Sequence, residues 1–174
     1  MTRHKELVKK CKDTGIQAVS LTDHGTMHGV FDFMKECKAG GVKGIPGIEA
    51  YMVPDSTKRE GIKGSEFHLT LLAMNNVGLK NLYKLSSRAF LEGYYYTPRI
   101  DHRLLKEHNA GIICLSGCLS SELGRAIRGT GSPDLVVNWF QEVFGDRYYL
   151  EVQENGEEEQ VIQNKGLYEL AAKH

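Results

Sequence analysis

Short apolar runs alternate with stretches of helical periodicity along this chain, and this alternation limits the fold more than any other feature. The runs that have the length and composition of strands are residues 16–22, 42–53, 67–73, 111–115 and 147–153. The stretches with apolar residues at helical spacing are residues 4–13, 26–40, 77–90, 120–128, 135–144 and 157–173. Strands separated by helices predict β/α units in a parallel sheet, which is either open or closed into a barrel. Right-handed crossovers then place the carboxyl ends of the strands at one edge, where chemistry is expected.

Local signals refine this pattern at a few positions. Thr26 and Asp101 mark helix starts, because their side chains can accept hydrogen bonds from the first backbone N–H groups of a helix. Pro46 and Gly47 predict a kink or bulge within the strand of residues 42–53, since proline and glycine interrupt regular strands.

The composition fits one domain of a reducing cytoplasm and gives it no charge bias. Across 174 residues, 22 Lys plus Arg balance 22 Asp plus Glu, so the chain lacks the basic surface that non-specific DNA binding needs. Any DNA contact is therefore expected to be weak, local or made by another part of a larger protein. No apolar run approaches the roughly 20 residues of a membrane span, and no signal peptide precedes the cysteines. Cys114 and Cys118 do not form a CxxC pair, so a structural zinc ribbon is not expected.

Ligand-type side chains lie at or near the ends of the predicted strands. His24 follows the first strand, Glu49 lies in the second, His68 lies in the third, and Cys118 follows the fourth. Imidazole, carboxylate and thiolate are the ligands expected for zinc or a similar transition metal. Each residue alone has a simpler explanation as a buried or hydrogen-bonded side chain, but together they predict a metal site at the rim. Asp23 is expected to orient the His24 ring rather than to bind the metal.

Other residues leave alternatives open. Arg99 contacts a substrate phosphate or a neighbouring domain, or it belongs to a turn that Asp101 caps. The tyrosines at positions 94–96 stack on unpaired bases or, because there is no basic groove, pack against another domain. Glu151 lies in a predicted strand, and if it faces the rim it supports the ligands rather than binding the metal.

Four segments carry a resemblance to a known family: GIQAVSLTDHGTMHGVFDFMKECKAGGVKGIPGIEAY, EFHLTLLAMNNVGLKNLYKLSS, GYYYTPRID and GIICLSGCLSSEL. In this order they resemble the PHP (polymerase and histidinol phosphatase) domain at the start of bacterial DNA polymerase III α subunits. TDHG is typical of PHP proteins generally, whereas HLTLLA, YYYTPRID and LSGCLSSE indicate the polymerase branch. The resemblance covers nearly the whole chain. It implies an α/β fold, a distorted (β/α)7 TIM-like barrel of which this chain is an incomplete part, with a rim site for up to three divalent metal ions such as Zn or Mn.

The resemblance also implies roles and partners. His24, Glu49, His68 and Cys118 match metal ligands of the family, whose metal-competent members hydrolyse phosphoesters and carry out 3′–5′ exonuclease proofreading. In other members the domain supports the polymerase and docks a separate exonuclease subunit. The parent protein would be the replicative DNA-directed DNA polymerase, a nucleotidyltransferase, and this piece alone is expected to be inactive. A stand-alone phosphoesterase of the histidinol-phosphatase type is an alternative that explains TDHG but not the polymerase-type segments.

Two motifs of the family do not occur in residues 1–174. The family opens with a strand that carries His-x-His, and it places Asp-x-His on a strand that would follow residue 174. We therefore expect residues 1–174 to form a partial PHP domain that lacks the first strand and the last strands of the barrel. The strands next to the missing ones would expose unpaired backbone groups and apolar side chains. The isolated chain is therefore expected to fold poorly without the first and last strands of the barrel.

Overall fold

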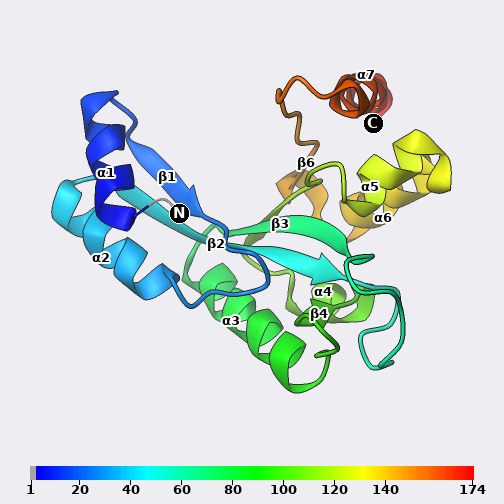
Figure 1. Ribbon diagram of the computed structural model, residues 1–174, viewed down its shortest axis with the longest axis horizontal. Helices are drawn as coiled ribbons and strands as arrows, with labels where there is room; N and C mark the ends of the chain where they lie inside the picture. Colours follow the sequence, from blue (N-terminus) through cyan, green and yellow to red (C-terminus); the bar gives the residue numbers. More distant parts are fainter. Residues whose placement is uncertain (1–2) are drawn as a thin grey trace.

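A computed structural model describes residues 3–174, which form a six-stranded sheet flanked by helices (Figure 1). The strands are β1 (Ala18–Leu21), β2 (Lys43–Met52), β3 (Phe67–Ala73), β4 (Arg99–Ile100), β5 (Ile112–Leu115) and β6 (Tyr148–Tyr149). The α-helices are α1 (His4–Asp13), α2 (Val30–Gly40), α3 (Asn76–Leu91), α4 (His102–His108), α5 (Glu122–Arg125), α6 (Pro133–Phe144) and α7 (Glu158–Lys173). A π-helical turn (Ala126–Thr130) extends α5, and a 3-10 turn (Gly145–Arg147) follows α6.

The long strand β2 organises the sheet, because three other strands pair with it. Its first part, Lys43 to Pro46, runs parallel to β1, and its second part, Gly47 to Met52, runs antiparallel to β3. The end of β2 also pairs in parallel with β4, on the side opposite β3, since a strand has only two edges. Beyond β3 the sheet continues through an antiparallel pairing with β5 and a parallel pairing of β5 with β6. The sheet order is therefore β1-β2-β3-β5-β6, with β4 beside β2.

The predicted all-parallel sheet is wrong at β3. Residues 53–66, between β2 and β3, contain no helix, so the chain returns as an antiparallel strand instead of crossing over to a parallel one. Pro46 and Gly47 lie where β2 changes its partner from β1 to β3, and they do not interrupt the strand. Within residues 3–174 the sheet is not closed, since β1 and β6 occupy its two ends.

Other differences from the predicted elements are local. The bounds of α1 and β3 are as predicted, but Thr26 does not cap α2, which begins only at Val30. The Thr26 hydroxyl instead accepts a hydrogen bond from His28 N at 3.2 Å within the loop before the helix. The predicted strand at residues 147–153 shortens to β6, because only Tyr148 and Tyr149 pair with β5.

The two faces of β2 differ in character. Ile48, Ala50 and Met52 are buried in an apolar core to which α3, α4 and α6 also contribute. Because successive residues of a strand point to opposite faces, Glu49 and Tyr51 point away from this core. The sheet therefore has one face that packs against helices and one face that carries polar side chains.

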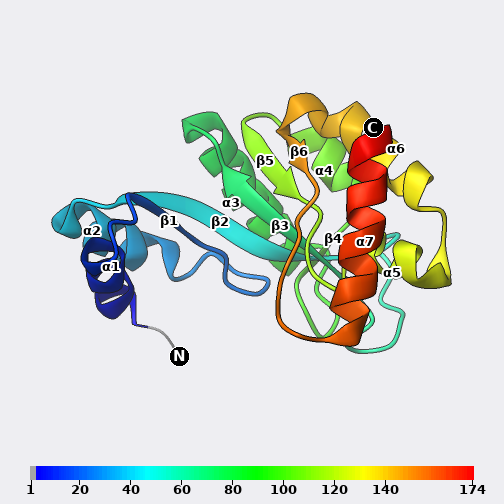
Figure 2. The ribbon, with the colours of Figure 1, turned by 90° about the horizontal axis from the view of Figure 1, so that it is seen from above.

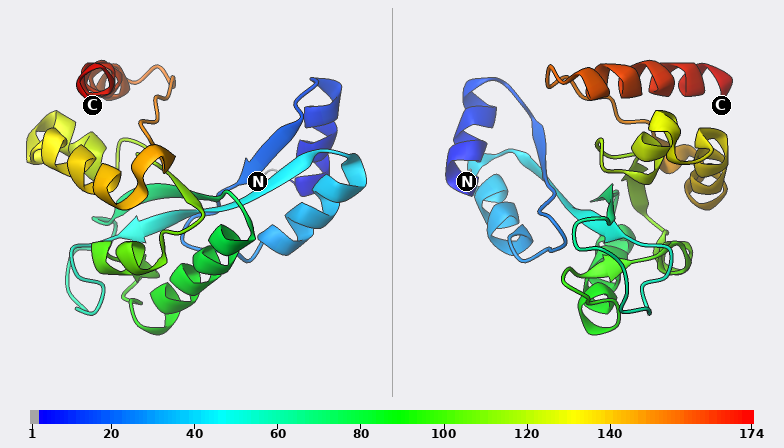
Figure 3. Two further views of the ribbon diagram at one scale, coloured as in Figure 1. Left: turned by 180° about the vertical axis from the view of Figure 1, so that it is seen from behind. Right: turned by 45° about the vertical axis from the view of Figure 1, so that its right-hand side comes forward.

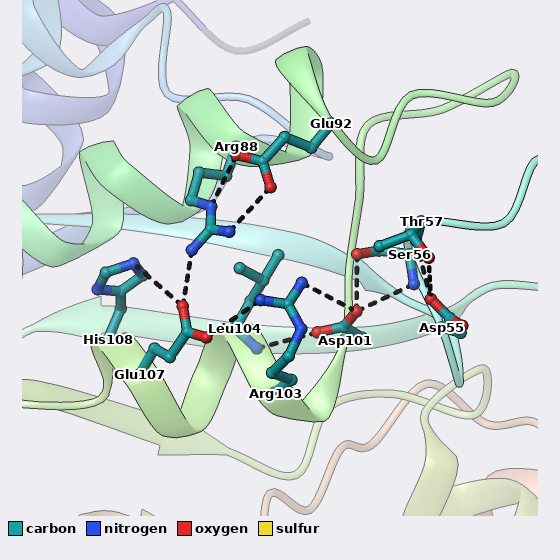
Figure 4. Close-up of polar contacts among 10 residues, drawn as sticks. All are labelled: Asp55, Ser56, Thr57, Arg88, Glu92, Asp101, Arg103, Leu104, Glu107 and His108. Atoms are coloured by element: carbon teal, nitrogen blue, oxygen red, sulfur yellow. Dashed lines mark hydrogen bonds and ion pairs between the residues drawn. The ribbon is translucent and has the colours of Figure 1, made fainter.

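Asp101 joins the loop after β2 to the start of α4 (Figure 4). Its Oδ1 accepts a hydrogen bond from Leu104 N at 2.9 Å, which confirms the predicted helix cap. Its Oδ2 accepts hydrogen bonds from the backbone N and the hydroxyl of Ser56 at 3.0 and 2.7 Å. Close by, Arg88 of α3 forms an ion pair with Glu107 of α4 at 2.7 Å. These contacts fix α4 against both the loop and α3.

Two groups of helices lie at the two ends of the molecule, and a third group lies on one face of the sheet. α1 and α2 lie side by side next to β1, and this end projects from the rest of the chain, as Figure 2 shows from above. α5, α6 and α7 lie at the other end, beyond β5 and β6, while α3 and α4 lie on the face with the apolar core (Figure 3). None of the helices within residues 3–174 combines the length and the hydrophobicity that crossing a bilayer requires.

Candidate metal centre

The register of β2 and β3 places Glu49 and His68 on the same face of the sheet. Glu49 lies opposite Thr70, and Tyr51 lies opposite His68. Directly opposed residues of an antiparallel pair point to the same face, so these side chains form a polar strip on the face away from the apolar core. His68 reaches the site from the beginning of β3, and not from the carboxyl end of a parallel strand as predicted.

His24 is held beside Glu49 by backbone pairing that continues the line of β1. Glu49 N donates to Asp23 O at 3.1 Å, and Gly25 N donates to Glu49 O at 2.8 Å. Gly25 has a φ of +66°, and a Cβ at this position would lie 2.8 Å from the Tyr51 ring, so glycine suits the turn that follows His24. In this arrangement His24 Nε2 lies 3.0 Å from Glu49 Oε2.

Cys118 reaches the site from the loop after β5. His68 N donates to Ser120 O at 3.3 Å, and Ser120 N donates to Cys118 Sγ at 3.4 Å, so the loop is fixed against the beginning of β3. Cys118 Sγ lies 3.7 Å from His68 Nδ1. The ligand atoms of Glu49, His68 and Cys118 all lie within 4.8 Å of one another.

Hydrogen bonds set the protonation of this cluster. The hydrogen bonds of His68 with Cys118 and Glu49 raise the pKa of His68 to about 9. The contact between His68 Nδ1 and Glu49 Oε1, at 2.7 Å, lowers the pKa of the Glu49 carboxyl below its ordinary value. The hydrogen bond with His68 also lowers the pKa of the Cys118 thiol. The cluster therefore favours a proton on His68, which lies between the Glu49 carboxyl and the Cys118 thiol, two groups that favour negative charge. A cation that replaces this proton would contact the same two groups.

The donor set and its spacing suit a divalent transition metal. Metal–ligand distances of about 2.0–2.3 Å place tetrahedral ligands roughly 3.5 Å apart. The separation of His68 from Cys118 (3.7 Å) is close to this value, and that from Glu49 (2.7 Å) is shorter, so side-chain movements that part His68 from Glu49 would form a site. The His24 side chain is 63% exposed, against 21% for Glu49 and 23% for His68, so the cluster is most accessible on the His24 side.

The structure does not place Asp23 in its predicted role. The Asp23 carboxylate points toward Gly29, where its Oδ2 would lie 2.8 Å from an added Cβ. Within residues 3–174 no hydrogen bond joins this carboxylate to the His24 ring. Asp23 contributes instead through its backbone oxygen, which accepts the hydrogen bond from Glu49 N.

Arg99 resolves one of the open alternatives from the sequence. It is buried, and its guanidinium donates to the backbone oxygens of Gly93, Glu60 and Lys58 at 2.9, 3.2 and 2.8 Å. The side chain therefore holds two loops together, which favours the structural role over a contact with substrate phosphate.

Tyr51 and Thr70 are parts of the polar strip that the sequence analysis did not identify. The Tyr51 ring packs edge-on against His24 and His68, with ring centroids 6.2 and 5.2 Å apart. Burial and the nearby Glu49 charge raise the pKa of Tyr51, so its hydroxyl stays protonated at neutral pH. A signal was present in the sequence, because Tyr51 and Thr70 each lie two positions after a candidate ligand, the spacing that shares a strand face.

Comparison with known proteins agrees with this geometry. The family described as "PHP domain" matches residues 1–155 of the chain. This chain belongs to the PHP domain family. The predicted resemblance is confirmed by this match, which covers the segments that carry His24, Glu49, His68 and Cys118.

The PHP domain is also similar to DNA polymerase III α subunits from several bacteria. It is 45% identical over 157 residues to the DNA polymerase III subunit alpha of Chlamydia pneumoniae, a match that covers 88% of this chain and 13% of that protein. It is 42% identical over 179 residues to the DNA polymerase III subunit alpha of Thermus aquaticus, with 98% of this chain and 15% of that protein covered. The PHP domain thus spans 13–15% of the length of these relatives.

A solved structure shows the same fold. A protein from Bifidobacterium adolescentis that is assigned as a metal-dependent phosphoesterase matches with a TM-score of 0.59 and 14% sequence identity. The match covers 100% of this chain and 79% of that chain. At this identity the likeness concerns the fold alone, and it confirms the predicted incomplete TIM-like barrel of PHP type.

Proposed function

We propose that this PHP domain is a metal-binding part of a bacterial replicative DNA polymerase III α subunit and that its site hydrolyses phosphoesters. The observation that supports it best is the convergence of His24, Glu49, His68 and Cys118 from separate segments on one polar face of the sheet. Similarity to polymerase α subunits supports the identity of the parent protein. Because the chain spans 13–15% of those relatives, nucleotidyl transfer is proposed for the parent and not for these 174 residues.

In this proposal the four residues hold divalent cations, Zn or Mn, and other segments of the parent supply the remaining ligands for up to three metal ions. A bound divalent cation supplies Lewis acidity, which activates water and stabilises charge on a phosphate. Glu49 directs one oxygen toward His24 and the other toward His68, at 3.0 and 2.7 Å, so both oxygens of its carboxylate would be available as ligands beside the two imidazoles. The Tyr51 ring packs against both imidazoles and restricts their rotation.

The substrate in this proposal is the 3′ end of a DNA strand, and the reaction is 3′–5′ exonucleolytic proofreading in the cytoplasm. A net charge of zero gives these residues little attraction for DNA, so the rest of the polymerase chain delivers the strand. The remainder of the α chain is therefore the principal partner. If the site holds no metal, the domain instead supports the polymerase and docks a separate exonuclease subunit.

The variant Glu49→Gln tests the proposal, because it removes the central charge with little change in shape. We expect it to reduce bound Mn²⁺ or Zn²⁺ in the full-length protein and to abolish metal-dependent release of nucleotides from a 3′-labelled single strand. Metal content after dialysis is measured by mass spectrometry, and hydrolysis is measured on gels.

Glu60→Gln is the matched control, since Glu60 is an exposed acid in the loop before β3. It should keep the metal content and the activity of the parent protein. Unchanged metal content in Glu49→Gln would refute the ligand assignment. A parent protein that holds no metal after supplementation would favour the supporting and docking role.

A further inference from the structure

A polar cavity of about 290 Å³ lies on the sheet face that carries Glu49. Hydroxyl side chains contribute to its lining, namely those of Ser20, Thr22 and Thr70. Acidic and thiol groups contribute as well, namely those of Glu49, Cys118 and Glu151. Because these residues come from β1, β2, β3 and the segments after β5 and β6, several parts of the chain offer donor atoms to one space. The cavity therefore extends the site beyond the four proposed ligands.

Glu151 is anchored in this cavity by its neighbours. Its backbone N donates to Ser116 Oγ at 2.8 Å, and Ser116 is buried directly after β5. Gln153 Nε2 donates to Glu151 Oε1 at 2.7 Å. The second carboxylate oxygen, Oε2, is buried and accepts no hydrogen bond from any group in residues 3–174. One oxygen of this carboxylate is thus fixed, while the other lacks a partner.

A buried carboxylate oxygen without a partner is unfavourable, and either a proton or a cation can satisfy it. Apolar surroundings favour the proton, because they penalise the charged form. Leu72 and Leu115 contribute to the lining of the cavity beside Glu151, but most of its lining residues are polar and offer hydroxyls, an amide, a second carboxylate and a thiol. Carboxylate and hydroxyl oxygens are ligands for hard divalent cations such as Mn²⁺ and Mg²⁺. The surroundings of Glu151 therefore favour a cation.

We propose that Glu151 is a cation-binding residue, which holds a hard divalent cation in the cavity that it shares with Glu49 and Cys118. Gln153 positions the carboxylate by fixing Oε1, which leaves Oε2 without a hydrogen-bond donor. The inference rests on the proposed function, since Glu49 belongs to both sites, and it adds an oxygen-rich position to the cluster of His24, His68 and Cys118. The position beside Glu151 is the harder of the two, because it has more carboxylate and hydroxyl oxygens beside the Cys118 thiol, whereas the other position combines this thiol with the imidazoles of His24 and His68.

The test is Mn²⁺ titration of the full-length protein and of its Glu151→Gln variant, followed by calorimetry and by the electron paramagnetic resonance of free Mn²⁺. We expect Glu151→Gln to lose one bound Mn²⁺ or to weaken its binding at least about tenfold, the size of effect known for groups around a metal site. Binding of Zn²⁺ should change much less. Glu154→Gln is the matched control, since Glu154 is an exposed acid three residues away, and it should leave the titration unchanged.

A second readout does not depend on metal binding. Without added metal, Glu151→Gln should melt at the same temperature as the parent or higher, because it removes a buried carboxylate of which one oxygen has no hydrogen-bond partner. With Mn²⁺, its melting temperature should rise less than that of the parent. Glu151→Asp keeps the charge and should retain more of the Mn²⁺ response than Glu151→Gln.

The outcomes separate this inference from the proposed function. If Glu49→Gln loses metal while Glu151→Gln keeps the Mn²⁺ stoichiometry and affinity of the parent, Glu151 binds no cation and the inference is wrong, whereas the proposed function stands. If neither variant changes the metal content, both are wrong. A Glu151→Gln variant that has lost Mn²⁺ and Zn²⁺ equally would also overturn the inference, because it would show a general collapse of the site.

Discussion

Among single residues, Cys118 is the one that we expect to determine which metal the centre prefers. Thiolate is a softer ligand than imidazole or carboxylate, so it contributes more to zinc affinity than to manganese affinity. We predict that Cys118→Ser lowers Zn²⁺ affinity at least about tenfold and lowers Mn²⁺ affinity much less. Competition titrations with a chromogenic chelator measure both. Equal losses for the two metals would count against a bond between Cys118 and the metal.

Gly25 is a second single residue whose role can be tested, because the chain turns at Gly25 directly after His24. An alanine there would combine a left-handed backbone with a Cβ only 2.8 Å from the Tyr51 ring. We predict that Gly25→Ala lowers the free energy of unfolding by about 2–4 kcal/mol, from backbone strain and overpacking together. Gly15→Ala is the control, since Gly15 has a φ of +72° with nothing within 4 Å, and it should cost about 1–2 kcal/mol. Urea denaturation measures both, and equal losses would show that the Tyr51 contact is unimportant.

Among the elements, α4 depends on the cap that Asp101 provides. Burial alone would raise the pKa of Asp101, but the hydrogen bonds from Leu104 N and Ser56 outweigh it and lower this pKa. The charged carboxylate therefore stabilises the fold at pH values above about 3.9, its ordinary value, and this contribution is lost as the pH falls through the lower folded pKa.

The corresponding prediction concerns Asp101→Ala, which removes the cap and leaves Ser56 without its acceptor. We expect the free energy of unfolding at pH 7 to fall by about 2–3 kcal/mol. The difference from the parent protein should shrink below about pH 4. Urea denaturation at several pH values checks both statements, with the exposed Asp32→Ala as a control that should change stability by about 0.5 kcal/mol or less. A difference that stays constant with pH would exclude the charged cap.

Element types were predictable from the sequence, and strand direction was not. Apolar periodicity and the Asp101 cap identify α1, β3 and α4, since these signals are local. The direction of β3 depends on residues 53–66, whose polar composition suits either a hairpin return or part of a crossover. The sequence pattern therefore predicted that the four candidate ligands converge, but it did so from an all-parallel sheet that the structure does not have. The role of Arg99 stayed open in the sequence, because its partners are backbone oxygens of distant loops, which no local pattern reveals. The predicted role of Asp23 is not seen, because its backbone oxygen and not its carboxylate contacts the site.

For the molecule as a whole, the open edge of β1 is the feature with the clearest consequence. Lys43 N donates to Gln17 O, so odd-numbered residues of β1 face β2 and Ala18 N–H points to the free edge. Such an edge can pair with a second chain. We predict that the 174-residue chain associates with increasing concentration and that Ala18→Pro, which removes one outward donor, weakens association. Sedimentation velocity measures this, and a chain that stays monomeric at all concentrations would contradict the prediction.

Because Cys118 reaches His68 from 50 residues further along the chain, the ligand cluster is complete only when distant segments have met. Contacts between distant segments form more slowly than local ones. An incompletely folded chain therefore offers a cation only part of the ligand set. Metal capture would consequently report that folding is complete, and each captured ion would draw the equilibrium further toward the finished domain.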